Sequence, residues 1–314
     1  MKTLIIFYIV FSATLALAQS TNPLFNDQVT VTKSHGGKIF LEGKSCTVLD
    51  REGKALEQWA KSVNDKTENK SCSCKNGLCH KEVTAQLPDF AEAFQFEHVS
   101  TDGPNCWNAT LVAAKIVPQV RYTSDFEMNF WMNSPLCKER AAGEKLKPGD
   151  IIAIRSKKQP EVHGFVHISE NLSFSKNGFN KNMPYSLQDP NSVFNIYNVP
   201  PECRRRNGTP DDCETYANYF SCISMDEYLK KNPIQDKLAS DAFNQLTEIE
   251  CAISDAILSG RSRNIKSLVT TTLAIIHRLS YDTISQKKYD PDDLVIWQAL
   301  FHKSRSLKDQ LTLL

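Results

Sequence analysis

The chain lacks an excess of charge of either sign. Its 314 residues include 37 lysines and arginines and 36 aspartates and glutamates, so the formal net charge is +1. Electrostatic binding to nucleic acid or to an anionic membrane needs a clear positive excess. The most basic stretch, "CRRRNG" at 203–208, holds three arginines and is typical of a solvated loop. The composition therefore favours neither a nucleic-acid partner nor an anionic membrane surface.

The chain also lacks a long apolar run after its first residues. Lys2, the apolar stretch "LIIFYIVFSATLAL" and the small residues "ALA" have the order of a secretion signal over 1–18, with cleavage after Ala18. No later run is long and uncharged enough to span a bilayer. We therefore expect a periplasmic or secreted protein that has no integral membrane segment after signal cleavage.

Cysteine, in contrast, is abundant. Ten cysteines in an exported chain predict disulfides. The cluster "CSCKNGLC" at 72–79 has no second knuckle of matching spacing, so we expect a disulfide-pinned turn rather than a zinc site. Cys203, Cys213, Cys222 and, further on, Cys251 predict a second stapled region. Because the total is even, one free thiol would leave another cysteine without a partner in the chain.

Two regions with strand patterns follow the signal. In 19–85, "QVTVTKSHGGKIFLEG" alternates and turns at two glycines as a β-hairpin would, and "SCTVLDREGKAL" at 45–56 continues the strand-and-turn character. We expect a strand-rich, disulfide-containing extension there. In 86–200, helical patterns at 106–116 and 123–133 precede the strand-like runs "LKPGDIIAIRS", "VHGFVHIS" and "NLSFSKNG". Helices followed by antiparallel strands predict an α+β domain.

The last region, 201–314, begins with a cysteine-rich loop and is then helical. Apolar residues recur three or four apart in three successive segments. Gly260 stands where a glycine would end the first helix, and Asp290 with Pro291 would open the third. We expect a disulfide-stapled α-helical accessory domain.

The stretch "GPNCWNATLVAAKI" places Cys106 between Pro104 and a helical pattern. At a helix N-terminus the free N–H groups and the helix dipole favour an anion, so we expect the pKa of the Cys106 thiol to fall. The thiolate is the nucleophilic form of cysteine. The placement predicts a catalytic nucleophile, and the alternative is one half of a disulfide.

A histidine base is expected to follow in the strands. His163 and His167 lie four apart in one strand-like run and therefore on the same face. His163 opens the strand, where a substrate can reach it, whereas His167 is expected to be packed or at the surface. On the next strand either Ser175 or Asn177 would orient the His163 ring.

The oxyanion of the reaction would lie at the start of the helix. We expect the backbone N–H of Cys106 to donate to it, helped by the side chain of Asn105 as a substrate-binding group.

"NCWN", "LKPGDIIAIR" and "HGFVHISENLSFSKNG", in this order and spacing, resemble the NlpC-type branch of the papain-like cysteine peptidases. The resemblance covers roughly 100–190 and implies a papain-like core, in which a cysteine-bearing helix packs on an antiparallel sheet. It matches Cys106 to the nucleophile, His163 to the base and Ser175 to the orienting residue. It also implies hydrolysis of amide bonds in peptidoglycan stem peptides, typically beside a γ-D-glutamyl residue, with no cofactor and no metal.

A second hypothesis is a non-catalytic protein of the same fold that binds a cell-wall peptide or a partner protein. The two hypotheses differ in Cys106, because a hydrolase needs a free thiol there and a disulfide would favour the binding protein. The bond cleaved, the disulfide connectivity, the role of 201–314 and the oligomeric state are not defined by the sequence.

Overall fold

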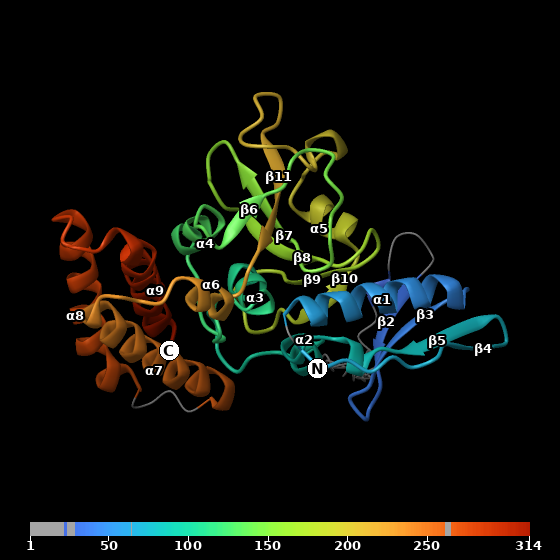
Figure 1. Ribbon diagram of the computed structural model, residues 1–314. Coiled ribbons are helices and arrows are strands. Elements are labelled where there is room, and N and C mark those ends of the chain that lie inside the picture. The colour runs from blue at the N-terminus through green and yellow to red at the C-terminus, as the bar shows by residue number, and fades with distance from the viewer. Residues whose placement is uncertain (1–21, 24–28, 64, 261–264) are drawn as a thin grey trace, which may run out of the picture.

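The computed structural model describes residues 22–23, 29–63, 65–260 and 265–314. The expected signal peptide at 1–18 lies outside these residues. Figure 1 shows a mixed α+β protein with two antiparallel sheets and a group of helices at its C-terminal end. No helix in the described ranges combines the length and the apolar character needed to cross a membrane.

The N-terminal part is a five-stranded antiparallel sheet, in the order β1-β2-β3-β5-β4, with one helix packed on it (Figure 1). The predicted hairpin is confirmed, since β2 and β3 pair along their length and Gly37 in the turn has a φ of 79°. The elements are β1 (Asn22–Pro23), β2 (Val29–Lys33), β3 (Ile39–Gly43), α1 (Cys46–Ser62), β4 (Ser73–Lys75), β5 (Leu78–Glu82) and a 3-10 turn at Thr84–Gln86.

The expectation of strand and turn at 45–56 is wrong, because this stretch lies within α1. Leu49, Leu56 and Trp59 are fully buried and share one face of the helix at helical spacing. Gly53 of this stretch lies where α1 packs against β5, and a Cβ atom there would overlap the side chain of Lys81.

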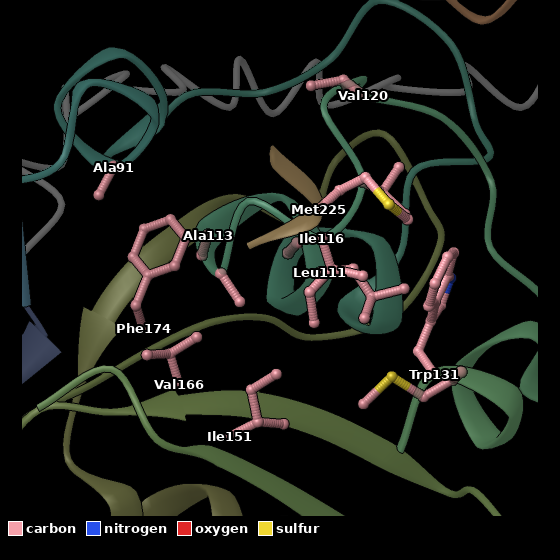
Figure 2. Close-up of a cluster of buried hydrophobic side chains, with 14 of the residues drawn as sticks. Ala91, Leu111, Ala113, Ile116, Val120, Trp131, Ile151, Val166, Phe174 and Met225 are labelled. Carbon is pink, nitrogen blue, oxygen red and sulfur yellow. The ribbon is translucent and has the colours of Figure 1, made fainter. Parts of the chain in front are cut away.

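The second sheet has six antiparallel strands in the order β10-β9-β8-β7-β11-β6, and the strands predicted around 151–176 are confirmed. In Figure 2, Leu111 and Ala113 of the central helix α3 lie over Ile151, Val166 and Phe174 of the sheet. The elements are α2 (Asp89–Phe94), α3 (Cys106–Ala113), α4 (Asp125–Met132), β6 (Cys137–Glu139), β7 (Ile151–Ser156), β8 (His163–His167), β9 (Ser173–Lys176), β10 (Tyr185–Gln188), α5 (Pro190–Ile196), a 3-10 turn at Pro201–Cys203 and β11 (Thr215–Cys222).

Strand β11 changes the expected domain organisation. It pairs with β7 on one side and with β6 on the other, so it lies inside the sheet that carries the candidate site. The division expected between 86–200 and 201–314 therefore cuts through one sheet. The pairing partners of β11 lie far back in the chain, and the local sequence pattern does not indicate them.

Four helices complete the chain: α6 (Met225–Lys231), α7 (Lys237–Ser259), α8 (Ile265–Ser285) and α9 (Leu294–Leu313). The three long helices match the three predicted patterns. Gly260 ends α7 with a φ of 70°, and a 3-10 turn at Pro291–Asp293, capped by Asp290, leads into α9. Figure 1 shows these helices on the opposite side of α3 from the N-terminal sheet.

Four disulfides link eight of the cysteines: Cys46–Cys72, Cys74–Cys79, Cys137–Cys222 and Cys203–Cys213. The disulfide-pinned turn expected at 72–79 is confirmed, because Cys74–Cys79 joins β4 to β5. The second stapled region is confirmed in part, because Cys203 pairs with Cys213 and Cys222 pairs with Cys137. Cys251 stays free, and the four disulfides all precede α6, so they do not staple the helices that follow. Four disulfides are compatible with a protein that folds in an oxidising compartment.

Cys106 and Cys251 are the two free cysteines among the described residues. The sequence predicted that a free Cys106 would leave a second cysteine unpaired, and the structure identifies it as Cys251. Cys251 lies on α7, where its sulfur accepts a hydrogen bond from Gln119 Nε2 at 3.0 Å.

Candidate active site

Cys106 is the first residue of α3, as predicted. Asn105 caps the helix, and its side-chain oxygen accepts a hydrogen bond from the Asn108 N–H at 3.0 Å. The helix is shorter than the expected 106–116, because Lys115 adopts a left-handed φ of 52° and the Ile116 N–H donates to the Leu111 carbonyl at 2.9 Å. This pattern is a Schellman motif, in which a lysine takes the position usually held by glycine.

The first turn of α3 packs directly on β8 at Gly164. A Cβ atom on Gly164 would lie 3.0 Å from Met128 Cε and 3.1 Å from Thr110 Oγ1, so a larger residue would push the helix away. The Gly164 N–H is close enough to the Cys106 sulfur to lower the pKa of the thiol. The thiol is therefore held next to the residue that follows His163.

His163 is the first member of a chain of hydrogen-bonded side chains. His163 Nε2 lies 3.0 Å from Ser175 Oγ, Ser175 Oγ donates to Asn177 Oδ1 at 3.4 Å, and Asn177 Nδ2 donates to Gln188 Oε1 at 3.2 Å. Because the serine proton is directed to Asn177, its oxygen is free to accept the Nε2–H of His163. The sequence left Ser175 and Asn177 as alternatives, and the structure places Ser175 against the ring with Asn177 behind it.

This arrangement accommodates the tautomer of His163 that carries its proton on Nε2. A proton on Nε2 leaves Nδ1 with a free lone pair, and Nδ1 is buried without a hydrogen-bond partner within the described part of the chain. Tyr197, just after α5, stacks on the ring with centroids 4.2 Å apart and planes 19° from parallel. The ring is thus fixed by a hydrogen bond at one nitrogen and by an aromatic face, with its basic nitrogen unoccupied.

Two other predicted residues lie at the edge of this arrangement. Asn105 donates from Nδ2 to the Thr123 carbonyl at 2.6 Å, so its amide ties the start of α3 to the segment before α4, and one amide hydrogen remains for a substrate oxygen. His167 lies at the far end of β8 and is 8% exposed. It is packed, which is one of the two placements expected for it.

Burial controls the protonation of Cys106 and His163. Cys106 is 6% exposed, and burial raises the pKa of its thiol to about 11, although the nearby N–H groups of Gly164 and Trp107 lower it. The expectation that the pKa of Cys106 would fall is therefore wrong, because loss of hydration outweighs the helix N-terminus. Burial also lowers the pKa of His163 to about 3. The resting pair is a neutral thiol and a neutral imidazole.

A buried lysine that sequence analysis did not select also acts on the thiol. Lys176 is fully buried, and its ammonium donates to the carbonyls of Gly178 at 3.0 Å and Asn180 at 2.8 Å. Burial lowers the pKa of Lys176 to about 8, and its charge favours ionisation of Cys106. The sequence could have indicated Lys176, because a lysine within an apolar strand is rarely buried without a partner.

One group of three possible metal ligands occurs among the described residues, formed by the sulfurs of Cys46, Cys72 and Cys74. All three sulfurs belong to disulfides and are not thiolates. Comparison with protein-family models, with curated proteins and with solved structures finds no match to this chain.

The low pKa of His163 predicts a loss of stability in acid. Below its ordinary pKa of about 6.5, the imidazole takes up a proton in the unfolded chain but not in the folded one, so unfolding is favoured as pH falls toward 3. Between pH 7 and pH 4 this should remove about 3 kcal/mol from the free energy of unfolding. Urea unfolding at both pH values should show that His163→Gln loses about 3 kcal/mol less than the parent protein. Equal losses in the two proteins would contradict the prediction.

Proposed function

We propose that this chain is an exported cysteine hydrolase with a papain-like core, in which Cys106 is the nucleophile, His163 the base and Ser175 the orienting residue. One observation carries the proposal. Cys106 stays out of the disulfides at the start of α3, this helix packs against β8, and on β8 His163 presents an unpaired Nδ1 and is held through Nε2 by Ser175. A nucleophile with a base that is oriented by a third group is the general pattern of nucleophilic catalysis.

In the proposed reaction the thiol proton moves to His163 Nδ1 as the Cys106 sulfur attacks a substrate carbonyl carbon. The backbone N–H of Cys106 and the remaining amide hydrogen of Asn105 donate to the resulting oxyanion. The imidazolium then protonates the leaving amine, and the C–N bond breaks to give a thioester. Water, deprotonated by the same imidazole, hydrolyses the thioester and restores the thiol.

Because Cys106 and His163 are both neutral at rest, substrate binding has to favour transfer of the proton between them. A carbonyl oxygen and an amide entering the site bring polar groups to a region that is otherwise dehydrated, and the positive charge on Lys176 favours the thiolate. From the sequence resemblance, we propose that the substrates are peptidoglycan stem peptides cleaved at an amide bond.

A non-catalytic binding role is the second candidate, and one observation favours it. Cys106 is 6% exposed and His163 is 0% exposed, so the pair is closed to solvent in this conformation. A binding protein does not need an accessible thiol.

Alkylation separates the two candidates. In a Cys251→Ser background Cys106 is the single free thiol among the described residues, so iodoacetamide can be followed to complete modification by mass spectrometry. We expect the untreated mature protein to release amines from purified stem peptides and the alkylated protein to release none. No release by the untreated protein would favour the binding role. Release that persists after complete alkylation would exclude Cys106 as the nucleophile of the hydrolysis.

A further inference from the structure

The segment that carries Cys106 is attached to the last helix of the chain. Gln310 on α9 is fully buried, and its Oε1 accepts a hydrogen bond from the Tyr122 N–H at 2.7 Å. Its Nε2 lies 3.3 Å from the Asp102 carbonyl and donates to it. A single side chain from the C-terminal region thus bridges the two segments that also meet through the bond between Asn105 and Thr123.

The segment before Cys106 leaves space for the side chain of Gln310. Gly103 has a φ of 129°, which residues with a Cβ rarely adopt, and a Cβ there would overlap Gln310 Oε1. On the other side of this segment, the Gly103 N–H donates to the Phe179 carbonyl at 3.0 Å and Asp102 Oδ1 accepts from the Lys181 N–H at 2.8 Å. Asp102 and Gly103 are therefore held between α9 and the loop after β9.

We propose that Gln310 is a positioning residue for Cys106, and that the C-terminal helices are part of the unit that holds the nucleophile rather than an independent accessory domain. The inference rests on the proposed function for its meaning in catalysis. Gln310 acts through the 102–105 segment, which fixes where α3 begins and so where the sulfur stands relative to Gly164 and His163.

The reactivity of the Cys106 thiol tests this proposal without any substrate. The full mature chain with Cys251→Ser is treated with iodoacetamide across a pH series, and the alkylation rate of Cys106 is measured by mass spectrometry. Gln310→Met keeps a similar volume and removes both hydrogen bonds. Because both bonds hold the closed arrangement around Cys106, we expect alkylation about tenfold faster or more. Gly103→Ala changes the other partner of the contact with Gln310, because its Cβ would overlap Gln310 Oε1, and it should also accelerate alkylation.

Ser306→Ala is the matched control. Ser306 lies one turn before Gln310 on α9, and its hydroxyl accepts from the Ser124 N–H at 3.0 Å and donates to Ser124 Oγ at 3.1 Å. This variant loses contacts between α9 and the 122–124 segment but keeps the contact with Asp102 and Gly103. We expect a lower melting temperature and an unchanged alkylation rate.

Two results would overturn the proposal. One is an unchanged alkylation rate in both Gln310→Met and Gly103→Ala. The other is an equal acceleration in Ser306→Ala at an equal loss of stability, since that would show a general loosening of the fold. Because stem-peptide hydrolysis is not measured, a failure of the proposed function leaves this test intact.

Discussion

Cys106→Ala should lower the rate of stem-peptide hydrolysis by at least about 10³-fold, because loss of a catalytic nucleophile removes the covalent route altogether. Alanine keeps the backbone N–H at the start of α3 and leaves His163, Ser175 and Asn177 in place. Those groups can still bind and polarise an amide, but they cannot form the thioester. The measurement is initial rates of amine release by the purified mature variant and its parent.

Cys251→Ala is the control for this prediction. Cys251 is also a free cysteine, but it lies on α7 against Gln119, and we expect its loss to leave the hydrolysis rate unchanged. Undiminished hydrolysis by Cys106→Ala would exclude Cys106 as the nucleophile. A rate that falls only in Cys251→Ala would move the reactive thiol to the C-terminal helices.

The second large effect is expected on stability, at a cluster of four buried charges between the sheet domain and the C-terminal helices. Arg121 pairs with Glu127 at 2.7 Å and with Glu250 at 2.8 Å, and Lys303 pairs with Glu250 at 2.5 Å. All four side chains are at most 3% exposed. Two positive and two negative charges balance, and Glu250 on α7 is the link between the core and α9.

Glu250→Gln should lower the free energy of unfolding by about 3–5 kcal/mol, because it leaves a buried positive charge without its partner. The double variant Glu250→Gln with Lys303→Met restores the balance of charge and should recover part of this loss. Urea unfolding at pH 7 measures both.

Asp282→Asn supplies the comparison for a surface pair. Asp282 pairs with Arg278 at 3.1 Å, with 40% and 82% of the two side chains exposed. Removing this pair should change the free energy of unfolding by less than about 1 kcal/mol. A Glu250→Gln variant that loses no more than Asp282→Asn would show that the buried cluster does not hold the helices to the core.

The local sequence pattern was sufficient to predict much of the candidate site and many of the helices and strands. Pro104 and the apolar stripe after it predicted the start of α3. The alternation of apolar and polar residues around His163 predicted β8 and β9. The interval between His163 and the next strand was enough to select Ser175 and Asn177 as its neighbours, because two short antiparallel strands joined by a tight turn bring these positions together. It did not choose between them.

Features that depend on distant parts of the chain could not be predicted from the local sequence pattern. The protonation of Cys106 depends on how much water the surrounding sheet and loops exclude, and no local pattern measures that. Strand β11 pairs with segments far earlier in the sequence, and Gln310 contacts the segment before Cys106 from near the end of the chain. The sequence pattern indicated the second half of helix α1, in "ALEQWAKSV" at 55–63, but its first half was missed. The packing of Gly53 in that first half is set by Lys81 on another element.

The burial of Cys106 also protects it from the compartment in which the protein is expected to fold. A thiol with a pKa near 11 and 6% exposure presents almost no thiolate to a passing disulfide or peroxide, and thiolate is the form that both oxidants require. One reduced cysteine can then persist in a chain whose other cysteines are largely oxidised. The same dehydration that suppresses the thiolate also preserves the thiol, so that only a molecule able to enter the site would reach the Cys106 sulfur.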